Sequence, residues 1–268
     1  MNTILVTGGN RGIGFEICRQ LDELGHNIIL GSRDYEKGNV AAKSLSKNVV
    51  VKQLDVTNEK SIQNLFEFVK INFGKLDVLI NNAGIGARKL TNENSALAKA
   101  KNFLETNIYG IREINKIIIP KLRKAGLVTN FEGAENISIA SAKLLMETNF
   151  YGPWRMIQVF IPLLLKSEEG RIINVSSGMG ELKSLFGDYP DYRMSKSSLN
   201  ALTIMFSNEL KEKGIKVNAF CPGWVKTDMG GPNAPRNVSE GADTAVWLAT
   251  EKEIQTGKFF RDHEEINW

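Results

Sequence analysis

The chain of 268 residues is longer than a typical domain but ordinary for a single unit built on an α/β sheet. A hydrophobic content of 42% supplies a full core, which excludes a disordered chain and a disulfide-stapled mini-fold. Lys and Arg number 34 against 30 Asp and Glu, and the net charge of +4 is spread along the chain. This balance gives no footprint for nucleic acid or for an anionic membrane.

Cysteine usage and the N-terminal segment indicate the compartment. Cys18 and Cys221 are far apart and lack the spacing of metal ligands, so we expect a reduced setting and no metal. The segment after Met1 turns glycine-rich at once, without a basic region or an apolar run of signal length. The longest apolar stretches, 117–119 and 160–165, are too short to span a bilayer. We therefore expect a soluble, cytoplasmic protein.

Short β-branched runs alternate with helical stretches along the chain. Such alternation predicts parallel strands joined by right-handed crossovers. The expected strands are 4–6, 27–30, 48–54, 76–80, 171–175, 215–220 and a last one near 258–260. No Pro/Ser/Gly-rich linker interrupts them, so we expect one α/β domain over residues 1–268. It would be a three-layer sandwich with a single open parallel sheet of about seven strands and helices on both faces.

An internal repeat occupies the middle of the chain. Residues 85–126 align without a gap on residues 127–168, and both copies contain Glu-Thr-Asn-x-Tyr-Gly, at 105–110 and 147–152. Two copies are too few for a solenoid, which needs three or more units. The repeat therefore indicates a tandem duplication of one loop-helix unit within the single domain.

A glycine-rich loop lies between the first strand and the first helix. Glycines at such a place let the backbone turn sharply and let a pyrophosphate reach the amides at the positive end of the helix. A purely structural turn is the alternative, but the position directly after the first strand favours nucleotide binding. The candidate residues are Gly8, Asn10, Arg11, Gly12, Ile13 and Gly14.

The end of the second strand selects the cofactor. Dinucleotide-binding sheets that prefer NAD place a carboxylate about twenty residues after the glycines, where it holds the ribose hydroxyls. Here Arg33 occupies that region, and a guanidinium suits a 2′-phosphate by bidentate pairing, with Arg11 as a second positive charge. The alternative is a solvated Arg33 with Asp34 serving NAD. The residues favour NADP(H).

Polar residues also follow the third and fourth strands. Asp55 and Val56 end the third strand, where a carboxylate can accept from the adenine amino group. A cap for the helix beginning near Thr57 is the competing role for Asp55. Asn81 ends the fourth strand and is followed by Asn82, Ala83 and Gly84, which we expect behind the cofactor, with the amide side chains tying neighbouring strands together.

A serine pair, a tyrosine and a lysine supply candidate chemistry. Ser176 and Ser177 end the fifth strand, and Tyr192 and Lys196 follow four residues apart, on one face of a helix. An unperturbed tyrosine, with a pKa of about 10, is a poor acid at neutral pH, and a nearby ammonium lowers that pKa. A chance pair on a helix surface is the alternative, which the upstream serines disfavour.

In this order these motifs resemble the short-chain dehydrogenase/reductase family. They are Thr7-Gly-Gly-Asn-Arg-Gly-Ile-Gly14, Asp55, Asn81-Asn-Ala-Gly84, Ser177, Tyr192-x-x-x-Lys196 and Cys221-Pro-Gly-Trp-Val-Lys-Thr227. Ser32-Arg33-Asp34, Thr227-Asp228-Met229 and the C-terminal 256–262 segment resemble the NADPH-dependent carbonyl reductases within it. The resemblance implies a Rossmann-type fold, NADP(H) as cofactor and hydride transfer to an aldehyde, ketone or quinone.

The resemblance also implies roles for individual residues. Tyr192 would protonate the alkoxide, Lys196 would lower the tyrosine pKa and hold the nicotinamide ribose, and Ser177 would orient the carbonyl. The segment of Pro222, Gly223, Val225 and Thr227 would hold the carboxamide end of the cofactor. An inactive NADP(H)-binding sensor or scaffold on the same fold is the alternative function. A methyltransferase would have no use for Tyr192 and Lys196.

The family also places a proton-relay asparagine on the helix before the serine strand, and here the repeat offers two. Asn107 lies at the usual distance after Asn82, and Asn149 lies at the usual distance before Ser177. The helix of the first copy has one charged face, whereas that of the second is apolar nearly all round, as in a buried helix. We therefore expect 141–166 in the family position with Asn149 as the relay residue, and 95–125 as an added outer helix.

The substrate is less determined than the chemistry. Mostly apolar residues around the site weakly favour a non-polar carbonyl compound; they are Met179, Leu182, Leu185, Phe186, Trp224 and Met229. A monomer and a homo-oligomer, dimer or tetramer, both remain compatible with the sequence.

Overall fold

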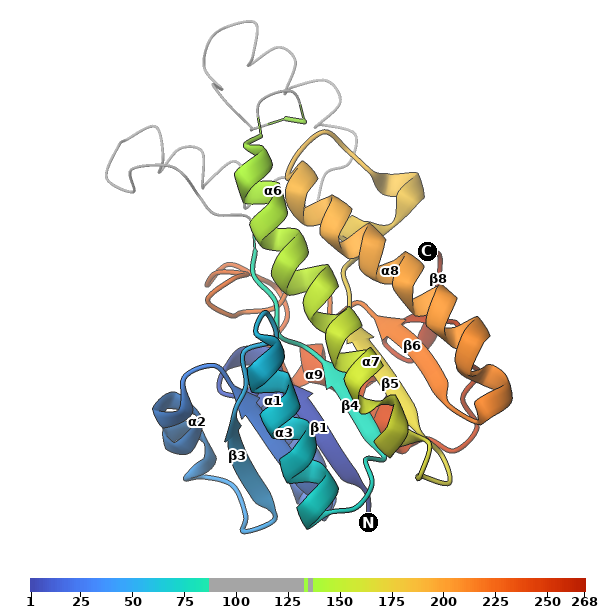
Figure 1. Ribbon diagram of the computed structural model, residues 1–268. Coiled ribbons are helices and arrows are strands. Elements are labelled where there is room, and N and C mark those ends of the chain that lie inside the picture. Colours follow the sequence, from blue (N-terminus) through green and yellow to red (C-terminus); the bar gives the residue numbers. More distant parts are fainter. Residues whose placement is uncertain (87–132, 135–136) are drawn as a thin grey trace, which may run out of the picture.

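The computed structural model describes residues 1–86, 133–134 and 137–268 (Figure 1). Within them, one sheet has the strand order β3-β2-β1-β4-β5-β6-β7-β8. Strands β1 to β7 are parallel and β8 is antiparallel to β7. The strands are β1 (Thr3–Thr7), β2 (Asn27–Ser32), β3 (Val49–Gln53), β4 (Val78–Asn81), β5 (Arg171–Val175), β6 (Lys216–Phe220), β7 (Phe259–Arg261) and β8 (Glu264–Ile266). The predicted α/β sheet is confirmed.

An eighth, antiparallel strand adds to the seven parallel strands that the sequence predicts. A two-residue turn, Asp262-His263, joins β7 to β8, and both residues have positive φ, 52° and 67°. Such a turn suits a hairpin but is usually signalled by Asn-Gly or Asp-Gly, which is absent here. β8 is short and begins with Glu264 and Glu265, so it also lacks the β-branched run by which the other strands are recognised.

Helices cover both faces of the sheet (Figure 1). The helices are α1 (Gly12–Glu23), α2 (Tyr35–Ala42), α3 (Glu59–Asn72), α6 (Ile139–Met146), α7 (Gly152–Leu164), α8 (Pro190–Leu210) and α9 (Val238–Thr250), with a π-helical turn, Glu147–Tyr151, joining α6 to α7. Short 3₁₀ turns occupy Gly178–Gly180, Leu182–Ser184 and Lys211–Lys213. The expected outer helix at 95–125, and residues 87–126 of the first repeat copy, lie outside the described residues.

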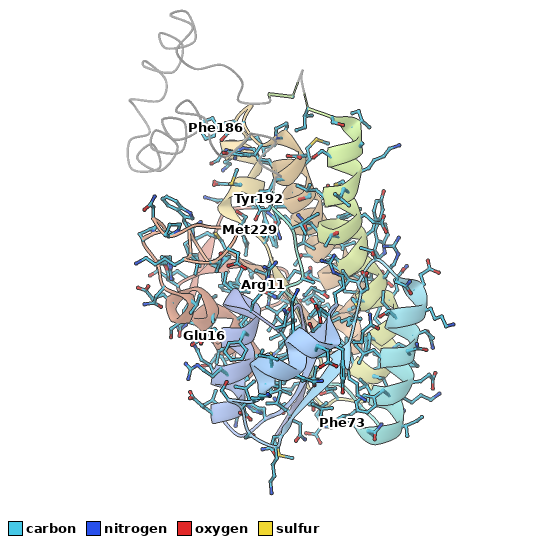
Figure 2. The ribbon with its side chains drawn as sticks, turned by 90° about the vertical axis from the view of Figure 1, so that its left-hand side faces the viewer. Arg11, Glu16, Phe73, Phe186, Tyr192 and Met229 are labelled. Atoms are coloured by element: carbon cyan, nitrogen blue, oxygen red, sulfur yellow. The ribbon has the colours of Figure 1, made fainter. Side chains whose placement is uncertain are left out.

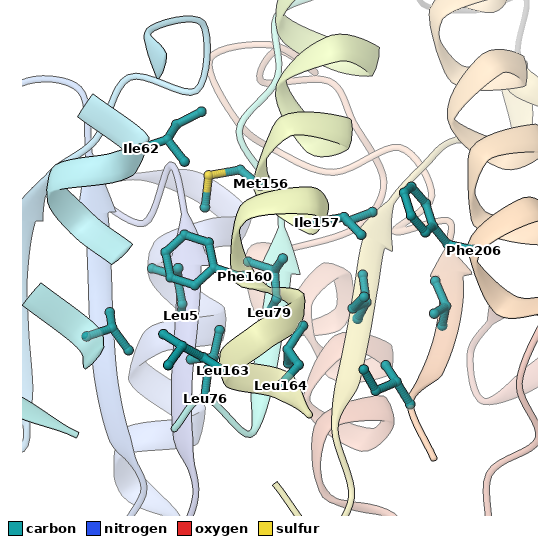
Figure 3. Close-up of a cluster of buried hydrophobic side chains, with 14 of the residues drawn as sticks. Leu5, Ile62, Leu76, Leu79, Met156, Ile157, Phe160, Leu163, Leu164 and Phe206 are labelled. Carbon is teal, nitrogen blue, oxygen red and sulfur yellow. The ribbon is translucent and has the colours of Figure 1, made fainter. Parts of the chain in front are cut away.

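The core is divided by the sheet into two layers. On one face Leu5 and Leu79 pack with α3, α7 and α8, and on the other Ile4 and Val6 pack with α1 and α9. Since side chains alternate along a strand, β1 buries both faces and reads as a continuous apolar run. In Figure 3, Met156 and Phe160 of α7 point toward the strands. Among the described residues between β4 and β5, the second repeat copy therefore supplies the helix that packs on the sheet.

Candidate active site

The glycine loop between β1 and α1 has positions that only glycine occupies without strain or overlap. Gly8 and Gly12 have positive φ, 67° and 55°, which favours glycine at both positions. A Cβ on Gly14 would lie 2.4 Å from the Gly8 carbonyl oxygen and 2.2 Å from Nδ2 of Asn82. The loop thus brings bare backbone to the N-terminus of α1, which fits a pyrophosphate.

The end of β4 is tied to this loop by hydrogen bonds. The backbone N–H groups of Asn82 and Ala83 each donate to Thr7 Oγ1 at 2.9 Å. Asn82 Nδ2 donates to the carbonyl oxygens of Thr7 at 2.8 Å and Gly8 at 3.1 Å. Asn81 Nδ2 reaches Asn174 Oδ1 on β5 at 2.9 Å. These amides connect neighbouring strands, as the sequence predicted, and fix the end of β4 against the glycine loop.

The side chains after β2 separate the two cofactor alternatives. Arg33 is exposed directly after the strand. Asp34 instead caps α2, where its carboxylate accepts from the Lys37 backbone N–H at 3.1 Å and pairs with Lys37 Nζ at 3.2 Å. The Lys37 backbone hydrogen bond holds the pKa of Asp34 below its ordinary value. Asp34 is thus engaged at the start of α2, while Arg33 is exposed beside it.

The structure gives hydrogen-bond partners to Arg11 and to Asp55, the carboxylate after β3. Arg11 pairs with Asp228 at 2.5 Å, and both side chains are mostly exposed. Asp55 Oδ1 accepts from the backbone N–H and the hydroxyl of Thr57, at 2.9 and 2.7 Å. Asn58, rather than Asp55, caps α3 by accepting from the Ser61 N–H. The competing helix-cap role therefore does not fall to Asp55.

Tyr192 and Lys196 lie near the start of α8, and Lys196 reaches the end of β5 two residues before Ser177. Lys196 Nζ donates to the Val175 carbonyl oxygen at 2.8 Å and lies 5.8 Å from the Tyr192 ring centroid. Lys196 is buried, and burial lowers the pKa of its ammonium to about 8. Ser177 is half-buried, and its Oγ accepts from the Met179 N–H at 3.2 Å. Tyr192 is half-buried and has a cationic side chain near its ring.

Asn149 lies in the π-helical turn and is almost fully buried, with 1% exposure. Its Nδ2 donates to the Ile85 carbonyl oxygen at 2.9 Å and to Ser195 Oγ at 3.0 Å, and its Oδ1 accepts from the Ile85 N–H at 2.8 Å. A Cβ on Gly84 would lie 3.3 Å from Asn149 Oδ1 and 3.8 Å from Lys196 Nζ. Asn149 and Lys196 therefore flank one point of the chain. Asn107 lies outside the described residues.

The loop after β6 approaches the glycine loop from the other side. A Cβ on Gly12 would lie 3.3 Å from Thr227 Cγ2. Thr227 Oγ1 accepts from the Gly230 N–H at 3.0 Å, Val225 is buried, and Gly223 has a positive φ of 77°. In Figure 2, Arg11, Met229 and Tyr192 are seen in the same part of the molecule, with Phe186 beyond them.

Three further side chains, which the sequence does not indicate as site residues, form hydrogen bonds around the site: Cys221, Ser195 and Arg261. Cys221 Sγ accepts from the backbone N–H groups of Gly178 at 3.1 Å and Gly223 at 3.4 Å, and from Arg261 Nη2 at 2.9 Å. Ser195 Oγ donates to the Tyr192 carbonyl oxygen at 2.8 Å while it accepts from Asn149. The spacing within Tyr192-x-x-x-Lys196 hints at Ser195, but no local pattern indicates the contact of Arg261 with Cys221.

Comparison with known proteins identifies the family. The sequence profile described as short chain dehydrogenase matches residues 2–131 and 122–237, which together span most of the chain. The chain belongs to the short-chain dehydrogenase family. This makes it an oxidoreductase, and it agrees with the resemblance that the motifs carry. The two matched segments overlap within the repeat.

Relatives in this family cover nearly the whole chain. Carbonyl reductase [NADPH] 1 of Mus musculus is 32% identical over 98% of this chain and 97% of its own length. (+)-Neomenthol dehydrogenase of Arabidopsis thaliana is 35% identical over 96% of this chain and 94% of its own. The structure of NADPH-bound carbonyl reductase from chicken fatty liver is 27% identical, with a TM-score of 0.77 over 100% of this chain and 99% of its own. Among the described residues of this short-chain dehydrogenase, no helix is both long and apolar enough to cross a membrane.

Proposed function

We infer that this chain reduces aldehydes, ketones or quinones with NADPH and uses Tyr192 as the proton donor. The observation that carries the inference is the buried Lys196 ammonium beside Tyr192. Lys196 lies near Gly84, which follows the strand next to the glycine loop. Family membership and relatives named NADPH carbonyl reductases support the same reaction. The balanced reaction takes a carbonyl compound, NADPH and a proton to an alcohol and NADP⁺.

The described residues fit the cofactor. The bare glycine backbone at the start of α1 suits the pyrophosphate, and Arg33 suits the 2′-phosphate because its guanidinium forms bidentate, charge-assisted hydrogen bonds. Bound NADPH supplies the hydride. The residues that would hold it are Gly8, Asn10, Arg11, Gly12, Ile13, Gly14, Arg33, Asp55, Val56, Asn82, Ala83, Gly84, Tyr192, Lys196, Pro222, Gly223, Val225 and Thr227.

Ser177 and Tyr192 act on the carbonyl oxygen. The Ser177 hydroxyl donates a hydrogen bond that orients the substrate carbonyl, and the Tyr192 hydroxyl delivers the proton as charge develops on that oxygen. Lys196 stabilises the phenolate that is left, because an ammonium favours a nearby negative charge. The pKa of about 8 lets Lys196 release and regain a proton near neutral pH.

Asn149 serves as the relay residue in this proposal. Its side chain fixes the Ile85 backbone next to Gly84, at the point that Lys196 Nζ also approaches. We infer that a water held there passes protons from bulk solvent to Lys196. Ser195 keeps the asparagine in register with the helix of Tyr192, since it bonds to both.

The test is NADPH consumption with a panel of aldehydes, ketones and quinones, measured by absorbance, with Tyr192→Phe as the control. The variant keeps the ring but loses the transferable proton. We expect turnover by the wild-type protein and a loss of about 10²- to 10⁴-fold in the variant, the usual contribution of a general acid. NADPH titration by fluorescence should show that the variant still binds the cofactor, through the other residues that would hold it. Tight NADPH binding without turnover of any substrate would indicate a sensor instead.

A further inference from the structure

Arg193, the residue after Tyr192, has a buried guanidinium whose side chain is 8% exposed. Its Nε donates to the Asp188 carbonyl oxygen at 2.8 Å and to Asp188 Oδ1 at 3.1 Å, and its Nη2 donates to the same carboxylate oxygen at 2.7 Å. Its Nη1 donates to the carbonyl oxygens of Met179 at 3.4 Å and Ser184 at 3.3 Å. The planar fork of an arginine makes these bonds in several directions at once.

These acceptors all belong to the segment 178–189, which connects the catalytic serine strand to the tyrosine helix. Met179 lies at its start, Ser184 in its middle and Asp188 at its end. The segment exposes three apolar side chains, with Leu182 at 66%, Leu185 at 44% and Phe186 at 57% exposure. The Arg193 guanidinium lies 5.3 Å from the Phe186 ring centroid, within the range of a cation–π contact. Arg193 therefore ties the start, the middle and the end of this apolar segment together.

The catalytic residues are held by other contacts. The Gly180 carbonyl oxygen accepts from Ser197 Oγ at 2.9 Å and from Asn200 Nδ2 at 3.3 Å. Ser176 Oγ donates to Asn200 Oδ1 at 2.5 Å. These bonds join the end of β5 to α8 without Arg193. Loss of Arg193 should therefore release the stretch 182–188 while Ser177, Tyr192 and Lys196 keep their places.

We propose that Arg193 is a specificity-determining residue, which holds residues 179–188 as an apolar wall of the substrate site and so favours bulky, apolar carbonyl compounds. The proposal rests on the carbonyl-reductase function inferred above and adds to it the residue that selects substrate size. An apolar wall contributes to binding in proportion to the area it covers. A bicyclic quinone should thus depend on the wall far more than a three-carbon aldehyde does.

The experiment compares Arg193→Met and Arg193→Lys with the wild-type protein on 1,4-naphthoquinone and propanal. Methionine keeps much of the apolar stem and removes the hydrogen bonds, whereas lysine keeps the charge without the fork. For Arg193→Met we expect a KM for the quinone raised about tenfold, the size of effect that pocket contacts produce, with kcat and the propanal KM within about twofold. The KM of Arg193→Lys for the quinone should lie between the values of the wild-type protein and Arg193→Met. Amide hydrogen exchange in 180–188 should speed up, while NADPH affinity stays unchanged.

Arg171→Ala is the matched control. Its side chain is 6% exposed and donates to Glu169 and to the Leu248 carbonyl oxygen, at the opposite end of β5 from Ser177. This variant should lose stability without changing the ratio of the two KM values. An equal KM change for both substrates in Arg193→Met, or no change, would overturn the proposal, and Arg193→Lys decides the case if the methionine variant does not fold. A wild-type protein that reduces neither probe nor any panel compound would instead contradict the proposed function.

Discussion

Two regions at the carboxyl ends of the strands differ in what they are made of: one consists of backbone and the other of side chains. Around β1 and α1, the site consists of closely packed backbone: a single added Cβ at Gly14 would meet the Gly8 carbonyl oxygen at 2.4 Å. Around β5 and α8, the site consists of side chains held by hydrogen bonds, among them Lys196 on the Val175 carbonyl oxygen and Asn149 on Ser195. The first region is damaged by adding atoms and the second by removing them.

This difference follows from what each region binds. A pyrophosphate is recognised by amide N–H groups and the positive helix terminus, so side chains only obstruct it. Proton transfer requires a titratable group at a fixed place, which only a side chain supplies. Tyr192→Phe, which removes one oxygen atom, is therefore expected to lower activity most in the second region. The corresponding change in the first region is Gly14→Ala, which adds one carbon atom.

Gly14→Ala is the largest effect expected for the glycine region. The new methyl group overlaps backbone as well as the Asn82 side chain, so the loop must shift. Overpacking of this kind typically costs about 1–3 kcal/mol, and we expect NADPH affinity to fall about a hundredfold or more because the amides move with the loop. Fluorescence titration with NADPH measures this loss.

Gly187→Ala is the control for the added methyl group. No described atom lies within 4 Å of the position that its Cβ would take. Its NADPH affinity should equal that of the wild-type protein. If Gly14→Ala also binds NADPH normally, the loop does not hold the pyrophosphate through its bare backbone, and the contrast between the two regions fails.

The two asparagines of the repeat provide a second test, with a smaller expected effect, for the region of β5 and α8. Asn149→Ala removes the group that fixes the Ile85 backbone beside Lys196. We expect kcat to fall about tenfold, less than for loss of the general acid itself, because Asn149 acts through Lys196. The pH profile of kcat should also change, because proton supply to a lysine with a pKa of about 8 is impaired. NADPH affinity should not change.

Asn107→Ala is the matched variant, since both asparagines lie in the same Glu-Thr-Asn-x-Tyr-Gly context. We expect wild-type kcat and an unaltered pH profile. A reversed result, with the loss in Asn107→Ala and none in Asn149→Ala, would assign the relay to the first copy. Steady-state rates across pH decide between the two copies.

The repeat also shows how far the sequence alone reaches. The strands were predictable because their runs are buried on both faces, and the order of Gly14, Asn82, Ser177, Tyr192 and Lys196 along the chain indicates the site. Two identical asparagine contexts cannot be distinguished by motif, and the prediction of Asn149 depended on the apolar surface of its helix. The choice of Asn149 over Asn107 stays a prediction, because Asn107 lies outside the described residues.

Other features had no local signal at all. Arg193 binds Met179, Ser184 and Asp188 through backbone and carboxylate oxygens, and an arginine that does so looks like any surface arginine in the sequence. The bond from Arg261 to Cys221 joins residues whose strands meet only in the folded sheet. Long-range contacts between polar groups depend on tertiary geometry, which hydrophobic patterning does not encode.

Arg33 sharpens the contrast, because it lies in the cofactor region and is expected to act there through its side chain. Arg33→Ala should weaken NADPH binding about tenfold, at the lower end of what a hydrogen bond to a charged group contributes, and leave NADH binding within about twofold. Lys37→Ala is the control: Lys37 is an exposed cation nearby, but it pairs with Asp34. It should change neither affinity by more than about twofold, the usual size of an exposed ion-pair effect. Equal losses in both variants would mean that the region provides only a general positive field, and equal losses of NADPH and NADH binding in Arg33→Ala would mean that Arg33 does not read the 2′-phosphate.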